Sequence, residues 1–207
     1  YIHLFIQYGS ITAFNREPSS FSLSNQPSSF YFDFALNDLF INPIRGFDMV
    51  NKLFPILHSE TWGDYWGYFL VTHGKGGVNN YEIVPYLGRV NLIALIPTAF
   101  FILGITYTMF SIFRNNKIQQ IFYILIFLSI LFTWIGYFWF LIKYPNLQQG
   151  DTIKATYIIL IINLLPFFGA NLIEKIRLWN EKFYNLILFI LLTIFIHNIP
   201  TFFTRYS

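Results

Sequence analysis

The sequence contains no cysteine and few charged residues, and each shortage excludes a class of protein. Without cysteine, disulfide bonds, thiolate metal sites and a cysteine nucleophile are all excluded. Charged residues make up only 11% of the chain, against roughly 25% in soluble domains. So few charges cannot cover a hydrophobic core with a water-facing surface. The composition therefore indicates an integral membrane protein.

Two further shortages narrow the possible ligands. The four histidines are far apart and show neither HxxxH nor HExxH spacing, so we expect no metal ion, and nothing in the sequence indicates a cofactor. The basic residues are scattered between apolar runs and the net charge is only +3. Nucleic-acid binding needs a clustered basic face, so no nucleic-acid partner is expected.

What the sequence has instead is long apolar runs. A helix needs about 20 apolar residues to cross the hydrocarbon core of a bilayer. The runs are continuous and do not alternate, which favours helices over a β-barrel. We therefore predict an all-α polytopic membrane protein in which residues 90–207 form a transmembrane bundle. Its four predicted spans are residues 90–113, 121–142, 155–173 and 183–199, the last of them ended by Pro200.

The first 89 residues differ from this bundle. Residues 1–9, "YIHLFIQYG", are apolar, and we expect them to be the end of a transmembrane helix that begins before this chain. Residues 10–89 are polar and rich in turn-forming residues, which predicts a loop segment with interfacial helices. Within it, residues 10–46 are expected to be a loop. Residues 47–57 have apolar positions at helical spacing, which predicts a short helix on the bilayer surface.

The basic residues between the spans predict the orientation in the membrane. The loop after the first span and the loop after the third hold five basic residues, against three in the second loop and the tail. The positive-inside rule therefore places the first and third loops in the cytoplasm. Residues 10–89 and the second loop then share the extracytoplasmic side.

The stretch "HSETWGDYWGYF" at positions 58–69 is the first candidate for a functional site. Trp and Tyr concentrate at membrane surfaces, so the stretch can be interpreted as an interfacial belt with solvated acids. Aromatic rings beside carboxylates also suit a sugar, because rings pack on its C–H faces and carboxylates accept hydrogen bonds from its hydroxyl groups. If the stretch is helical, Glu60 and Asp64 share one face. Trp62 and Trp66 then form another stripe.

A second candidate lies in the loop that leads into the third span. Lys154 stands at the mouth of that span. It can extend to lipid headgroups, as basic residues at helix ends usually do, or it can bind a lipid-linked phosphate. We expect Asp151 to cap the helix. Asn163, Asn171 and His197 lie within spans, and we interpret them as structural groups that form hydrogen bonds between helices.

The order of these segments resembles a known superfamily. It runs "SSFYFDFALNDLFINPIR", "FPILHSETWGDYWGYF", a span, and then "QQGDTIKATYIILIINLLPFF". This order is similar to the C-terminal part of GT-C polytopic membrane glycosyltransferases, in particular the protein O-mannosyltransferase and lipid A aminoarabinose transferase group. The matching positions are Trp62, Gly63, Asp64, Gly150, Lys154, Tyr157 and Pro166. Lys154 differs from the family pattern, which often has an arginine near that glycine. A lysine cannot form the bidentate hydrogen bonds to phosphate that an arginine forms.

The resemblance implies transfer of a sugar from a polyprenyl-phosphate donor to an acceptor glycan, lipid or protein, on the outer face of a bacterial plasma (inner) membrane. It places the catalytic carboxylate in a first outer loop that precedes this chain, and it implies no metal ion. The candidate substrate-binding residues are Glu60, Trp62, Asp64, Trp66 and Lys154. The candidates for the phosphate side are Arg45, Arg89 and Lys154.

Two other functions remain open. The aromatic richness also suits a non-catalytic membrane subunit that binds a partner through residues 10–89. A transporter or flippase fragment is the third possibility. It predicts ionisable residues deep in the spans, and the spans contain almost none.

Overall fold

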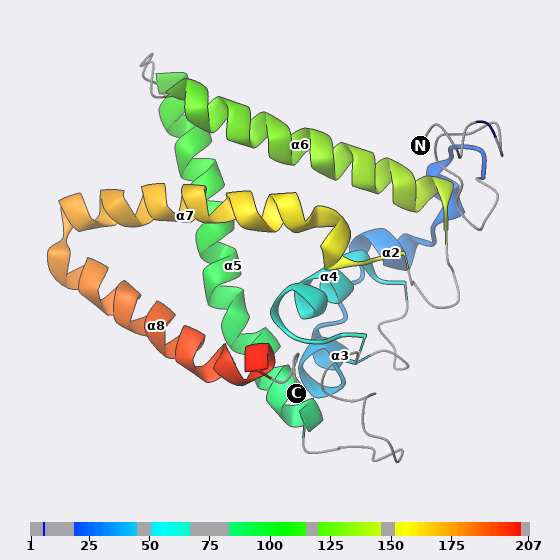
Figure 1. The fold of residues 1–207 in the computed structure, drawn as a ribbon, viewed down its shortest axis with the longest axis horizontal. Coiled ribbons are helices and arrows are strands. Elements are labelled where there is room, and N and C mark those ends of the chain that lie inside the picture. The colour runs from blue at the N-terminus through cyan, green and yellow to red at the C-terminus, as the bar shows by residue number, and fades with distance from the viewer. Residues whose placement is uncertain are drawn as a thin grey trace.

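A computed structural model of the chain describes residue 6 and residues 19–44, 51–66, 83–114, 120–145 and 152–203. Most of these residues are helical, and four helices are long and apolar enough to cross a membrane (Figure 1). This confirms the predicted all-α polytopic membrane fold. The four helices are α5 (Ile83–Arg114), α6 (Gln120–Lys143), α7 (Ile159–Trp179) and α8 (Glu181–Phe203).

The helices extend beyond the predicted spans at several ends. Helix α5 begins at Ile83, well before the predicted start at residue 90. A short 3-10 helix, η2 (Ala155–Ile158), leads into α7, and α7 continues to Trp179. The prediction that Pro200 ends the fourth span is wrong, because α8 continues through it to Phe203. The apolar composition of a segment indicates where it enters the lipid. The helix itself can continue into water, because its backbone hydrogen bonds do not depend on lipid.

The crossing of α5 and α7 is the closest contact between the membrane helices (Figure 1). A Cβ added to Gly104 of α5 would lie 2.5 Å from the Phe168 carbonyl oxygen of α7. Small residues allow helix backbones to approach in this way. Asn171 Nδ2 donates to Thr108 Oγ1 across the same pair of helices at 2.9 Å. This bond agrees with the interhelical role predicted for Asn171.

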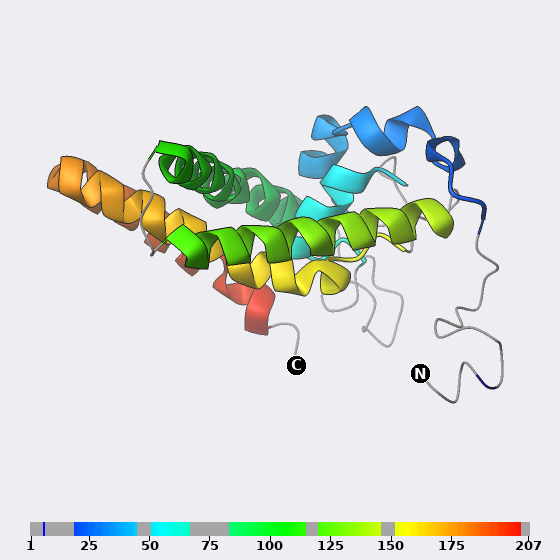
Figure 2. The same cartoon turned by 90° about the horizontal axis from the view of Figure 1, so that it is seen from above.

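The short helices gather at one end of the bundle (Figures 1 and 2). The start of α5, the end of α6, the start of α7 and the end of α8 point toward this end. The prediction that residues 10–46 form only a loop is wrong, since this segment contains three short helices. The short elements are η1 (Leu23–Asn25), α2 (Ser28–Phe32), α3 (Leu36–Ile41) and α4 (Leu53–Trp62).

Helix α4 does not match the surface helix predicted over residues 47–57. It begins at Leu53 and runs to Trp62, while residues 47–50 lie outside the described part of the chain. Pro55 is its third residue, in the first turn, where a missing backbone N–H costs little. Most of its first residues are buried, so α4 is a core helix at this end of the bundle.

Buried polar groups attach the short helices to α5. Asn91 is fully buried, and its Nδ2 donates to the Leu39 carbonyl and to Ser59 Oγ, both at 3.1 Å. Ser59 Oγ in turn donates to the Pro43 carbonyl at 3.0 Å. One asparagine of α5 therefore holds both α3 and α4.

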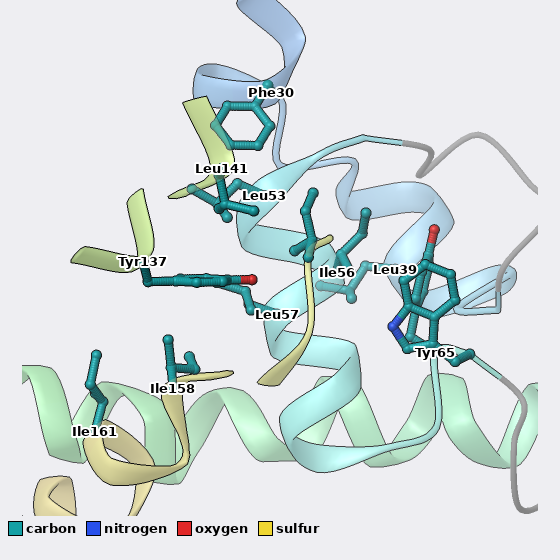
Figure 3. Close-up of a cluster of buried hydrophobic side chains, with 12 residues drawn as sticks. Phe30, Leu39, Leu53, Ile56, Leu57, Tyr65, Tyr137, Leu141, Ile158 and Ile161 are labelled. Atoms are coloured by element: carbon teal, nitrogen blue, oxygen red, sulfur yellow. The ribbon is translucent and has the colours of Figure 1, made fainter. Parts of the chain in front are cut away.

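The main hydrophobic cluster lies between α4, α6 and the start of α7 (Figure 3). Figure 3 shows Leu53 and Leu57 of α4 beside Leu141 and Tyr137 of α6, while Ile56 lies toward Leu39. The cluster continues along the chain to Tyr65 and Trp66. Packing of this kind fixes the position of α4 relative to the membrane helices.

Candidate functional site

Helix α4 ends inside the candidate stretch, which changes how its residues are arranged. Gly63 is the C-cap residue, and its N–H donates to the Ser59 carbonyl at 2.8 Å. Asp64 and Trp66 lie beyond the helix, Trp66 in a turn. The prediction that Glu60 and Asp64 share a helix face, and that Trp62 and Trp66 form a stripe, is therefore wrong.

Trp62 and Trp66 consequently contact different parts of the protein. Trp62 faces α5, where its Nε1–H donates to Thr98 Oγ1 at 3.0 Å and its ring stacks on Phe101 with centroids 6.3 Å apart. Trp66 is buried and packs edge-to-face against Tyr65. The two indoles thus belong to two neighbouring sites.

Trp66 forms one side of the first site, together with Lys154. The Lys154 ammonium group lies over the Trp66 ring, 5.6 Å from its centroid, which is a cation–π distance. The structure therefore brings together a residue of the "WGDYW" stretch and the basic residue at the mouth of the third span. These residues are 88 positions apart in the sequence.

A buried tyrosine holds the segment that carries Lys154. The Tyr137 hydroxyl of α6 accepts a hydrogen bond from the Lys154 backbone N–H at 2.9 Å, and it lies 3.2 Å from the Thr152 carbonyl, to which it donates. The Tyr137 side chain is only 6% exposed. Figure 3 shows its hydroxyl directed at the chain that passes between α4 and α6. Tyr137 thus fixes where the third span begins.

The two acids of the stretch occupy different environments. Glu60 is partly exposed, and its carboxylate is close enough to the Tyr137 hydroxyl to interact with it electrostatically. Asp64 is only 4% exposed, and it has interaction partners within the protein. A buried carboxylate needs such partners to offset its lost hydration. Glu60 is thus the more accessible of the two.

Tyr157 completes an aromatic wall beside Lys154. Its ring is exposed, with its centroid 6.0 Å from the centroid of Tyr137 and 5.6 Å from that of Phe140. The first site, which we call the Lys154 site, consists of Lys154, Trp66, Tyr157, Glu60 and Tyr137. It combines one cation, one accessible carboxylate and several aromatic rings.

The other predicted phosphate-binding residues are not placed in this site. Arg45 lies outside the described residues, as do Gly150 and Asp151. Arg89 lies on the exposed surface of α5. Among the described residues, no hydrogen bond or salt bridge joins Arg89 to Lys154. Of the three phosphate candidates, the structure connects only Lys154 to the predicted substrate wall.

The second site is a large cavity beside Trp62. It has a volume of about 860 Å³ and is bounded by α4, α5, α7 and α8. That volume is within the range of small-molecule sites, roughly 300–1,000 Å³. Most of its lining is aliphatic or aromatic. Its polar lining residues are His58, Thr61, Trp62, Thr98, Asn163, Asn198 and Thr201.

His58 is the titratable residue of this cavity. Its Nε2 lies 2.9 Å from the Asn91 carbonyl oxygen, which can only accept, so Nε2 carries the proton. Burial lowers the pKa of His58 below its ordinary value of 6.5, although the hydrogen bond to Asn91 acts in the opposite direction. His58 is therefore neutral at pH 7, and its Nδ1 is left as a hydrogen-bond acceptor.

Sequence reasoning did not identify Tyr137 or His58 as site residues. Tyr137 lies in an aromatic-rich apolar run, and nothing in its spacing shows that it meets residues 152–154. His58 is the first residue of the candidate stretch. Its spacing of four residues from Trp62 places both on one face of a helix, and this was the available signal. Among the described residues, no three His, Asp or Glu side chains are close enough to hold a metal ion.

Comparison of the chain with protein-family models, with curated proteins and with solved structures found no match. The resemblance to GT-C glycosyltransferases thus gains no support from these comparisons. The functional argument therefore depends on the geometry of the Lys154 site and of the cavity.

Proposed function

We propose that the chain is part of a membrane glycosyltransferase that transfers a sugar from a polyprenyl-phosphate donor to an acceptor on the outer face of the membrane. The observation that carries the proposal is the position of the Lys154 ammonium 5.6 Å from the Trp66 ring centroid. Such a donor has a phosphate, which a cation can bind, and a sugar, which aromatic rings can bind. Both a cation and aromatic rings are present at this end of the helix bundle.

The chemistry of the donor assigns a role to each group. Its phosphate carries negative charge that grows as the sugar leaves, and a fixed cation stabilises that charge. The Lys154 ammonium supplies this cation. The exposed ring of Tyr157 offers a stacking surface for the C–H face of a sugar, and the Glu60 carboxylate accepts hydrogen bonds from sugar hydroxyls.

The burial of Asp64 and Trp66 gives them a positioning role in this proposal. Both side chains are less than 5% exposed, so neither offers a free surface to a sugar. Trp66 contacts the Lys154 ammonium, and Asp64 directly follows the C-cap residue of α4. The predicted orientation, with this end of the bundle outside the cell, is part of the same proposal.

The test is sugar transfer from a polyprenyl-phosphate donor, measured in membranes that contain the complete protein as its gene encodes it. Lys154→Ala is expected to reduce kcat/KM at least tenfold, while Lys154→Arg retains part of it. The chain provides a matched control in Lys143, whose ammonium lies 5.9 Å from the Trp139 ring at the end of α6. Lys143→Ala removes an equivalent cation–π pair outside the Lys154 site and is expected to retain full transfer.

The transfer assay can contradict the proposal. Equal transfer by wild type, Lys154→Ala and Lys143→Ala would refute the role of Lys154. Absence of transfer in the wild type, together with a stable partner protein captured in mild detergent, would favour the alternative of a non-catalytic membrane subunit.

A further inference from the structure

The cavity between α4, α5, α7 and α8 differs from the Lys154 site in its charge. None of the described residues that line it is an Asp, Glu, Lys or Arg, and its histidine is neutral at pH 7. A phosphate or other charged group inside it would be buried without a counter-charge, which is strongly unfavourable. Its occupant is therefore uncharged.

Asn163 indicates that the occupant is not a pure hydrocarbon. This residue lies within the span Ala155–Trp179 and lines the cavity from α7. Its side chain makes no hydrogen bond within the described part of the chain. An amide left unpaired at this depth costs free energy, because hydrocarbon offers no partner. Pro166, which also lines the cavity, lacks the N–H that would bond to the Ile162 carbonyl.

His58 of α4 adds a hydrogen-bond acceptor to the lining. Its Nε2–H is committed to the Asn91 carbonyl, which leaves Nδ1 as the acceptor. The amide of Asn163 can both donate and accept. A hydroxyl group, which is donor and acceptor in one, can bond to either of these lining residues. The remaining lining is aliphatic and aromatic and suits a lipid chain.

We infer that this cavity binds an uncharged membrane lipid with a free hydroxyl group, of the diacylglycerol type. The lipid chain occupies the apolar lining between α5, α7 and α8, and the hydroxyl bonds to a polar lining residue, Asn163 or His58. The charge of the lining separates this site from the Lys154 site, which suits an anionic lipid.

Within the proposed function, such a lipid would be the sugar acceptor. The bond between the sugar C1 and the donor phosphate oxygen breaks, and polyprenyl phosphate leaves. A new bond forms between C1 and the lipid hydroxyl oxygen, and the hydroxyl proton passes to a carboxylate base. This acceptor role depends on the proposed function, whereas the binding of the lipid does not.

The experiment uses three photoreactive lipids in vesicles that contain the complete protein. They are a diacylglycerol with a diazirine on one acyl chain, its methyl ether, and the phosphatidate with the same chains. The labelled residues are identified by mass spectrometry of peptides. We expect the diacylglycerol to label residues that line the cavity several-fold more than the methyl ether or the phosphatidate.

Two neighbouring leucines of α8 provide the matched variants. Leu191 lines the cavity, whereas Leu192 is exposed and lies outside it. Leu191→Trp adds a bulky ring to the cavity wall and is expected to reduce the labelling several-fold, while Leu192→Trp retains it. Asn163→Leu, which keeps the branched shape and the number of side-chain heavy atoms, is expected to remove the preference for the free hydroxyl. This variant tests the inference even if Leu191→Trp does not fold.

Three outcomes would overturn the inference. Equal labelling by all three lipids would show a non-selective lipid-facing surface. Equal labelling of the Leu191→Trp and Leu192→Trp variants would place the lipid elsewhere. Absence of label in the cavity would show that another transmembrane segment covers it.

Sugar transfer to a non-lipid acceptor, with no labelling, would refute this inference alone. Labelling without any sugar transfer would refute only the proposed function.

Discussion

The Tyr137 hydroxyl supports the most specific prediction that the structure makes. Tyr137→Phe removes one oxygen atom and leaves the ring packed as before. It also leaves two backbone groups without their partner, the Lys154 N–H and the Thr152 carbonyl. The aromatic contacts of Tyr137 with Tyr157 and Phe140 remain. The variant thus tests the hydrogen bonds alone.

The expected magnitude follows from these two groups. Leaving a buried polar group unpaired costs about 1–3 kcal/mol. Residues 152 and 154 are partly exposed, so we expect a total loss of about 2 kcal/mol in the free energy of unfolding. For a chain of this size, that corresponds to a decrease of roughly 4–8 °C in melting temperature. The segment that carries Lys154 should loosen, and transfer should decrease as well.

Thermal unfolding in detergent, followed by circular dichroism, measures this effect. Tyr123→Phe is the control, because Tyr123 lies on the same helix and its hydroxyl makes no hydrogen bond within the described residues. We expect Tyr123→Phe to change the melting temperature little. If Tyr137→Phe lowers it no more than Tyr123→Phe does, then the Tyr137 hydroxyl does not hold residues 152–154, and the account of the Lys154 site is wrong.

Two other predictions concern the helix crossing and the cavity. Gly104→Ala places a methyl group against the Phe168 carbonyl and is expected to cost about 1–3 kcal/mol. Gly136→Ala, where an added Cβ meets no atom within 4 Å, should be neutral or stabilising by roughly 0.5–1 kcal/mol. Thermal unfolding of the two variants in detergent measures the difference. Since the pKa of His58 is lower in the folded than in the unfolded state, stability should be constant above about pH 7 and should fall as the pH decreases below 6.5. His58→Gln keeps the donor to Asn91 and should abolish this fall between pH 6.5 and 5; an unchanged fall would contradict the assignment to His58.

The membrane fold could be predicted from the sequence because its signal is local. Each of the four spans is a run of about 20 apolar residues, and lipid exposure alone requires such a run to be helical. The same reasoning predicted hydrogen bonds between helices for Asn163, Asn171 and His197, and it held for Asn171. It was wrong for the side chains of Asn163, which makes no hydrogen bond within the described residues, and of His197, which pairs with Asn198 of its own helix. The helix ends could not be predicted as well, because hydropathy does not report where a helix ends in water.

The candidate site could be predicted only in part. The aromatic stretch and Lys154 could both be identified from the sequence as candidates. The structure brings Trp66 of this stretch and Lys154 together. Their arrangement could not be predicted, because Gly63 ends α4 and turns Trp66 away from Trp62. The Tyr137 contact joins α6 to the following loop through tertiary packing, which leaves no periodic signal. The orientation in the membrane stays a prediction.

The most direct test of the central claim is to locate where a lipid-linked phosphate binds. A polyprenyl phosphate with a photoreactive group on its first isoprene unit would be added to membranes that contain the complete protein, and the labelled peptides would be sequenced. The account predicts adducts on residues 64–66 and 152–157, and their loss in Lys154→Ala but not in Lys143→Ala. Adducts confined to the exposed surface of α6, unchanged in Lys154→Ala, would contradict it.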